Sequence, residues 1–167
     1  LCSNCIFGLS PGSTVIMIKV KNLYKSFGEN KVLNNISFSV RNGESLAIVG
    51  KSGSGKSVLL KCLIGLLKPN SGEVYVEGKF INSMTFRQLQ EIRARIGMVF
   101  QFGALFDSMT VGENIGLALN KLTKLSKDEV RERIHHSLAE VGMDKTESLM
   151  PSELSGGMNK RVGIARA

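Results

Sequence analysis

Gly50-Lys51-Ser52-Gly53-Ser54-Gly55-Lys56-Ser57 matches the pattern G-x-x-x-x-G-K-[ST]. An unbroken apolar run, Leu46–Val49, precedes it, and a segment with helical apolar spacing, Val58–Leu67, follows it. Short apolar runs of this kind are typical of parallel strands buried on both faces. A strand, a glycine-rich turn and a helix in this order predict an α/β domain.

The chemistry of this loop explains its spacing. Glycines let successive backbone N–H groups turn inward, and the start of the following helix adds a partial positive charge, so the loop can wrap phosphates. We expect Lys56 to lie against the β- and γ-phosphates and the Ser57 hydroxyl to hold Mg²⁺. A glycine- and serine-rich connector without function is the alternative. Kinases, GTPases, helicases and transporters share such a loop, so it indicates only a nucleoside triphosphate.

Composition narrows the class of protein. The 167 residues are 43% hydrophobic and 22% charged, which suits one globular domain or a piece of one. No run of about 18 uncharged apolar residues is present, which excludes a membrane-spanning helix. The net charge of +8 suits polyanions such as nucleic acid, anionic lipid or nucleotide phosphates without choosing among them. Three cysteines argue against a disulfide framework.

The residues around the loop predict alternating elements. Strand character appears at Ile18–Val20, Ile36–Val40 and Glu73–Glu77. A polar helix is expected over Thr85–Arg95, followed by a further apolar strand over Ile96–Phe100. These elements extend the α/β pattern on both sides of the loop.

The second half of the chain is predicted to be mostly helical. Thr110 can cap a helix over Val111–Leu119, and Ser126 to Glu129 form an S-x-x-E capping box. The helix that this box opens has one apolar stripe, and Gly142 is placed to end it; the stripe consists of Val130, Ile134, Leu138 and Val141. The adjacent His135 and His136 point in different directions, so we interpret them as solvated helix residues.

A second glycine-rich helix start follows, at Leu154-Ser155-Gly156-Gly157-Met158. Ser155 can cap the helix, and the glycines leave N–H groups open to an anion. By itself LSGG could be a helix start of no consequence. At this distance after a phosphate loop it resembles the LSGGQ signature of ATP-binding-cassette (ABC) ATPases, with Met158 in the glutamine place. The segment Lys160–Ala167 resembles that family's continuing helix.

The resemblance implies roles for specific residues. It implies ATP and Mg²⁺ as cofactors, with Lys56 and Gln101 as the catalytic residues and Ser57 and Gln101 as the metal ligands. Phe27 occupies the position where the family stacks an aromatic ring on adenine, with Val32 beside it. The remaining ATP contacts would come from residues 50–57 of one subunit and from Ser155, Gly156 and Gly157 of the other.

The resemblance also implies an architecture. It is a P-loop NTPase (RecA-like) α/β core with an N-terminal antiparallel β subdomain and an α-helical signature subdomain at about residues 105–160. We expect residues 17–167 to be this domain, incomplete at its C-terminus, and residues 1–16 to be a disordered leader with an accidental Cys2–Cys5 pair. The family's apolar strand ending in Asp-Glu and its switch histidine do not occur in the sequence, so we expect these 167 residues alone to be inactive.

The resemblance finally implies partners. Phe102, Leu105 and Phe106 would form an exposed apolar patch, and the region Phe102–Val111 would receive integral membrane permease subunits. The protein would work as a homodimer or with a paired nucleotide-binding subunit, peripherally on the cytoplasmic face of the inner membrane. The combination of Phe100–Phe106 with Leu154–Met158 and Lys160-Arg161 is most similar to Mla/Mce-type phospholipid-trafficking ATPases, so the transported substrate would be a lipid or a small molecule.

Two alternatives remain open at this point. One is a soluble ABC-type ATPase acting on nucleic acid or ribosomes, which the positive charge favours slightly. The basic residues are dispersed and no aromatic-rich basic motif is present, so nucleic acid is not the expected partner. The other is the inactive product of a gene fragment.

Overall fold

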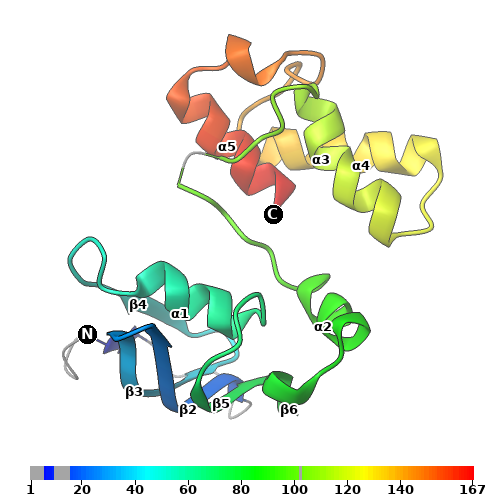
Figure 1. Ribbon diagram of the computed structural model, residues 1–167. Helices are drawn as coiled ribbons and strands as arrows, with labels where there is room; N and C mark the ends of the chain where they lie inside the picture. The colour runs from blue at the N-terminus through cyan, green and yellow to red at the C-terminus, as the bar shows by residue number, and fades with distance from the viewer. Residues whose placement is uncertain (1–5, 10–15, 102) are drawn as a thin grey trace. The chain divides into compact units, whose positions relative to one another are not determined.

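A computed structural model describes residues 6–9, 16–101 and 103–167, the side chains of residues 6–9 and 16 excepted. The chain divides into two compact units, Leu1–Arg93 and Ala94–Ala167. Among the described residues the first unit holds two antiparallel sheets and helices α1 and α2, and the second holds helices α3, α4 and α5 (Figure 1).

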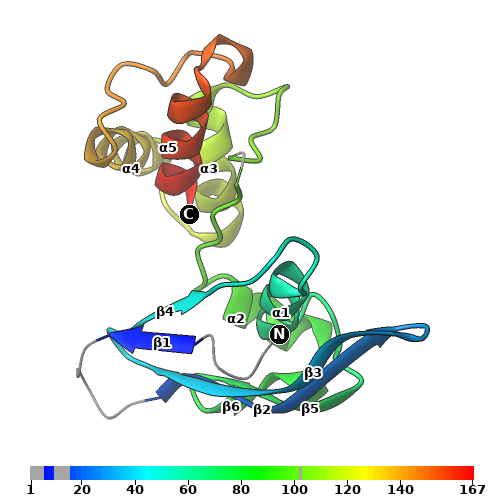
Figure 2. The same ribbon diagram turned by 90° about the vertical axis from the view of Figure 1, so that its left-hand side faces the viewer.

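The larger sheet of the first unit has the strand order β3-β2-β5-β6. Its strands are β2 (Ile16–Phe27), β3 (Asn30–Arg41), β5 (Ser71–Val76) and β6 (Lys79–Phe80). β2 and β3 are longer than the segments predicted from the sequence. Helix α1 (Lys56–Leu63) lies over one face of the sheet in both views (Figures 1 and 2). The core between them contains Val20, Leu23, Leu33, Leu59, Cys62, Leu63 and Val74.

Strand β4 (Ser45–Ile48) leads into residues 50–57, the segment that we call the phosphate loop. The strand differs from the parallel strand that was expected here. It pairs antiparallel with β1 (Ile6–Leu9), with Ile6 opposite Ile48. Its residues alternate between exposed and half-buried, so the prediction of burial on both faces was wrong. Burial on both faces needs a covering layer on each, and the alternation shows that one face of β4 still meets water. The four residues of β1 belong to the segment 1–16, which was expected to be a disordered leader, and they form a strand in the structure.

Helix α1 ends earlier than the expected boundary at Leu67. Gly65, with φ +66°, follows the helix in the left-handed conformation. The Leu66 N–H donates to the Lys61 carbonyl at 2.9 Å, which is the long hydrogen bond of a Schellman motif. An ideal Cβ on Gly65 would stand 2.7 Å from Leu89 Cδ2, so glycine also permits close packing. Glycine at this helix end therefore serves both the left-handed backbone conformation and the close contact with Leu89.

Leu89 belongs to helix α2 (Phe86–Arg93), which lies within the predicted span Thr85–Arg95 after a short 3-10 turn, Ile81–Ser83. Arg93 at the end of α2 donates from Nε to the Ile64 carbonyl at 2.9 Å and from Nη2 to the Gly65 carbonyl at 2.7 Å. These bonds satisfy carbonyl groups that the end of α1 leaves without helical partners. The guanidinium thereby fastens α2 to α1.

The second unit is a small helical bundle. It contains α3 (Val111–Leu122), α4 (Lys127–Glu140) and α5 (Gly156–Arg166), with a 3-10 turn at Pro151–Glu153. The predicted caps are confirmed, because Thr110 and Ser126 each form a complete capping box. The core consists of Val111, Ile115, Leu138, Met143 and Val162, with Ile134 and Val141 of the predicted stripe packed against it. The helical subdomain bounds of about 105–160 stay a prediction.

The prediction of a strand over Ile96–Phe100 was wrong, because these residues form no regular element. A strand needs a neighbouring backbone, and no described strand pairs with this segment. Gly97 packs instead against the end of α5, where an ideal Cβ would stand 2.5 Å from the Ala167 carbonyl oxygen. Val99 and Phe100 are 52% and 45% exposed.

No described helix combines the length and the apolar character that crossing a membrane would require. Cys2 and Cys5 lie outside the described residues, as does most of the expected leader.

Candidate functional site

The phosphate loop connects β4 to α1 through two glycines in the left-handed region. Gly53 has φ +77° and Gly55, the N-cap of α1, has φ +90°. The Ser54 N–H donates to the Lys51 carbonyl at 3.2 Å, which closes the turn. Other residues adopt such φ values only under strain, so the spacing of the glycines reflects the backbone shape of the loop.

Gly55 is also the point where the loop packs on the sheet. An ideal Cβ there would stand 2.9 Å from both Val32 Cγ1 and the Val32 carbonyl oxygen, and 3.1 Å from Leu33 Cδ2. β3 therefore supports the loop directly. The structure brings Val32, a predicted ATP contact, against this loop.

Lys56 folds back over the loop. Its ammonium donates to the Gly50 carbonyl at 2.8 Å and to the Lys51 carbonyl at 2.9 Å. An ammonium has three N–H donors, so one remains for a phosphate oxygen. The positive charge is held at the glycine-lined turn, which is the arrangement that an anion requires.

Two serines of the loop bear on whether phosphates and Mg²⁺ fit. Ser54 Oγ is buried and has no hydrogen-bond partner in the structure. Buried hydroxyls rarely stay unpaired, and a phosphate oxygen would satisfy this one. Ser57, in the first turn of α1, is exposed and offers the hard oxygen that Mg²⁺ prefers. The residues present therefore fit both groups.

Phe27 lies at the end of β2, where it pairs with Asn30 of β3. Half of its surface is exposed, and the Lys25 ammonium stands 5.1 Å from the ring centroid. An exposed ring beside a cation suits stacking on an electron-rich base. Its role in adenine binding stays a prediction.

The second glycine-rich helix start lies in the helical unit. The Ser155 hydroxyl accepts from the Met158 N–H at 3.3 Å, which confirms Ser155 as the N-cap of α5. Ideal Cβ atoms on Gly156 and Gly157 would have no neighbour within 4 Å. The first turn of α5 is therefore open to a ligand, and its N–H groups have no helical partners.

Gln101 is exposed in the segment that precedes α3. It belongs to the helical unit, whereas Ser57 belongs to the first unit, so the joint binding of Mg²⁺ by these two residues stays a prediction.

The expected apolar patch is smaller than the sequence indicated. Leu105 packs against the core of the helical unit and does not contribute to the exposed patch. This packing is favourable because it removes the apolar surface of Leu105 from water. Phe106 is 52% exposed, and Phe102 lies outside the described residues.

Sequence reasoning missed Asn114. Its side chain is fully buried and its Oδ1 accepts from the Phe106 N–H at 2.7 Å. Its Nδ2 lies 2.9–3.1 Å from the carbonyl oxygens of Phe106, Met109 and Thr110. The amide thus shapes the turn that presents Phe106. A polar residue on the apolar side of a predicted helix was the sign that could have revealed it.

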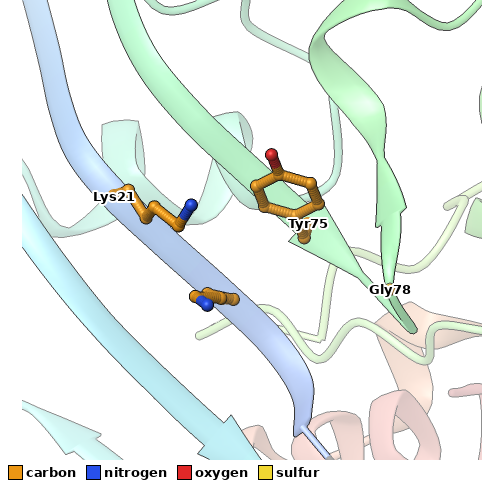
Figure 3. A pocket seen from close by; sticks show the side chains of 4 residues that line it. Lys21, Tyr75 and Gly78 are labelled. Carbon is orange, nitrogen blue, oxygen red and sulfur yellow. The ribbon is translucent and has the colours of Figure 1, made fainter.

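A hollow of about 290 Å³ lies on the sheet of the first unit, lined by Lys19, Lys21, Tyr75 and Gly78 (Figure 3). The Lys21 ammonium bonds the Glu73 carboxylate at 3.0 Å and stands 5.5 Å from the Tyr75 ring centroid. The Glu73 bond satisfies Lys21, and none of the predicted site residues lines this hollow.

Comparisons with known proteins agree with this geometry. The family model described as ABC transporter matches residues 33–167. "Protein TRIGALACTOSYLDIACYLGLYCEROL 3, chloroplastic" from Arabidopsis thaliana is 46% identical over 91% of this chain and 44% of its own length. "Methionine import ATP-binding protein MetN" from Brucella abortus (strain 2308) is 41% identical over 94% of this chain and 42% of its own length. The chain thus spans less than half the length of these relatives.

Among solved structures, the chain resembles the ATP-binding cassette MJ0796, a dimer in a post-hydrolysis state bound to ADP and Pi. The TM-score is 0.81 at 36% identity, over 90% of this chain and 68% of that one. The fold is that of ABC ATPase cassettes, with an antiparallel sheet and a helical unit. The match of the family model over most of the chain, and this likeness, show that the chain belongs to the ABC transporter family.

Proposed function

We propose that the complete protein is the ATP-binding subunit of a transporter and that ATP binds at residues 50–57. The observation that carries this proposal is the position of the Lys56 ammonium, which two loop carbonyls hold at the glycine-lined turn with one N–H to spare. The Ser54 hydroxyl of the same loop, which is buried and has no hydrogen-bond partner, would supply a further donor.

The residues divide the work of phosphoryl transfer. The loop amides and Lys56 bind and orient the phosphates, and the Phe27 ring stacks on the base. Ser57 and Gln101 would hold Mg²⁺, which neutralises charge on the β- and γ-phosphates when bound. Gln101 would also orient the attacking water.

A second subunit completes the site in this proposal. Ser155, Gly156 and Gly157 of one copy would offer the open N–H groups of α5 to the γ-phosphate held by the other copy. The related cassette MJ0796 was solved as a dimer, which supports this arrangement. ATP would hold the two copies together and hydrolysis would release them.

The 167 residues are proposed to bind ATP without hydrolysing it. No apolar strand ending in Asp-Glu occurs in the sequence, and neither His135 nor His136 matches a switch histidine. Without these groups, the attacking water is not polarised and the transition-state charge is not fully stabilised.

We propose a lipid as the transported substrate and the cytoplasmic face of the inner membrane as the location, with docking to permease subunits through residues 102–111. The relative that bears the name of a glycolipid, at 46% identity, supports the lipid assignment over the methionine importer at 41%. The exposed Phe106, held by the buried Asn114, supports the docking surface.

Titration with ATP, ADP and AMP tests the nucleotide site. Because the loop holds the β- and γ-phosphates, ATP and ADP should compete for one site, and AMP should bind at least about 100-fold more weakly. Equal affinity for all three nucleotides would contradict a phosphate-directed site.

A further inference from the structure

The segment that carries Gln101 is fastened to helix α5 on both sides of that residue. On one side, Gly97 lies so close to α5 that an ideal Cβ would stand 2.5 Å from the Ala167 carbonyl oxygen. On the other side, an ideal Cβ on Gly103 would stand 2.6 Å from the Asn159 carbonyl oxygen. Backbone therefore packs on backbone before and after Gln101.

Gly163 completes the second contact from the side of the helix. An ideal Cβ on Gly163 would stand 2.9 Å from the Gly103 Cα, so each glycine leaves room for the other. Packed backbones of this kind have discrete positions and do not slide freely.

Arg166 adds a polar clamp at the same place. Its Nη1 donates to the Ala104 carbonyl at 2.6 Å and its Nη2 donates to the Gly103 carbonyl at 2.9 Å. Ala104 has φ +49°, a conformation that a residue with a Cβ adopts only with support from its surroundings. Loss of solvent lowers the pKa of Arg166, so the guanidinium gives up hydration to make these two bonds. A bidentate contact to two successive carbonyls fixes the direction of the backbone.

The same helix begins at Ser155, whose open first turn is a proposed γ-phosphate contact. We propose that Arg166 is a positioning residue for ATP hydrolysis, because it clamps the Gln101 segment to α5 so that Gln101 and the Ser155 end of the helix move as one body. This inference rests on the proposed function. A shift of α5 toward nucleotide would then carry Gln101 with it.

Arg161 provides a matched control on the same helix. Its Nη1 donates to the carbonyls of Val141 and Gly142 at 3.2 Å and 3.1 Å, at the end of α4. Removing Arg161 therefore also removes two hydrogen bonds from α5 to backbone carbonyls, without touching the segment at Gln101.

The test compares Arg166→Ala, Arg166→Lys and Arg161→Ala in the complete protein. Arg166→Ala should lower kcat about tenfold or more while the KM for ATP stays within about twofold, because the phosphate loop is unchanged. Arg166→Lys should recover part of the loss, since an ammonium can still reach one carbonyl. Arg161→Ala should leave kcat within about twofold of wild type.

Hydrogen exchange without nucleotide gives a second readout. Arg166→Ala should speed amide exchange over residues 97–104, and Arg161→Ala should speed it at the end of α4 instead. Equal losses of kcat in the two alanine variants, or unchanged exchange over residues 97–104 in Arg166→Ala, would overturn the inference. If Arg166→Ala does not fold, the lysine variant decides by the same two readouts. A wild-type protein that binds no ATP would refute the proposed function itself.

Discussion

The Val32 carbonyl oxygen stands 2.9 Å from the point that a Cβ on Gly55 would occupy. Gly55→Ala should therefore distort the phosphate loop or push it off β3, in addition to the strain at φ +90°. We expect it to lower the free energy of unfolding by about 3 kcal/mol or more. Urea denaturation measures this loss.

Gly53→Ala is the control for this prediction. Gly53 has φ +77° but no atom within 4 Å of its ideal Cβ, so only the backbone strain applies. The expected loss is about 1 kcal/mol. Equal losses in the two variants would show that contact with Val32 does not matter.

Ser155 should have two separable roles. Ser155→Ala removes the hydroxyl that accepts from the Met158 N–H, which should cost about 1 kcal/mol of stability. Ser155→Asp keeps an N-cap acceptor and should be as stable as wild type, but its carboxylate would repel the γ-phosphate. ATP-dependent dimerisation, followed by light scattering, should weaken at least about tenfold in the aspartate variant. Dimerisation of that variant at wild-type affinity would remove Ser155 from the nucleotide site.

The buried amide of Asn114 should stabilise the turn before α3. Asn114→Ala leaves the Phe106 N–H and carbonyl without this partner, which should cost about 2–4 kcal/mol. Limited proteolysis should cut near residues 106–110 faster than in wild type. Asn114→Asp would place a buried carboxylate oxygen against the carbonyl oxygens that Nδ2 now faces, so its loss should be at least as large as that of the alanine variant. A variant as stable as wild type would contradict this account of the turn.

Glu73 should make the first unit sensitive to acid. A hydrogen bond from the Lys21 side chain, and another from Tyr75, hold the pKa of Glu73 below its ordinary value of 4.5. A lowered pKa stabilises the fold above the unfolded value of 4.5, and this contribution disappears as pH falls through the folded value. Glu73→Gln should be less stable than wild type at neutral pH and equal to it in strong acid. Thermal melts from pH 7 to pH 2 measure the difference, and a gap that does not close in acid would contradict the assignment.

The local features of the fold could be predicted from the sequence because short-range chemistry determines them. The caps at Thr110 and Ser126 depend on residues three positions apart, and the phosphate loop depends on glycines within eight residues. The end of α1 at Leu63 was less clear, because Gly65 stands inside an apolar run that also suits a longer helix.

The features that sequence reasoning missed depend on distant parts of the chain. Arg166 binds carbonyls more than 60 positions away, and no local pattern reports such a contact. The strand expected over Ile96–Phe100 failed for the same reason, since an apolar run becomes a strand only where a neighbouring backbone pairs with it. Leu105 was expected on the surface, but it packs against the core of the helical unit. Its burial could not be predicted, because it depends on how α3 and α5 pack.

Nucleotide affinity of Lys56→Ala in the complete protein tests the central claim most directly. Lys61→Ala is the matched control, because Lys61 lies in the last turn of the same helix, away from the phosphate loop. Lys56→Ala should weaken ATP binding at least about tenfold, since the phosphates lose a charge-assisted hydrogen bond, while Lys61→Ala should bind ATP as wild type does. Unchanged ATP affinity in a folded Lys56→Ala protein would contradict the assignment of residues 50–57 as the phosphate site.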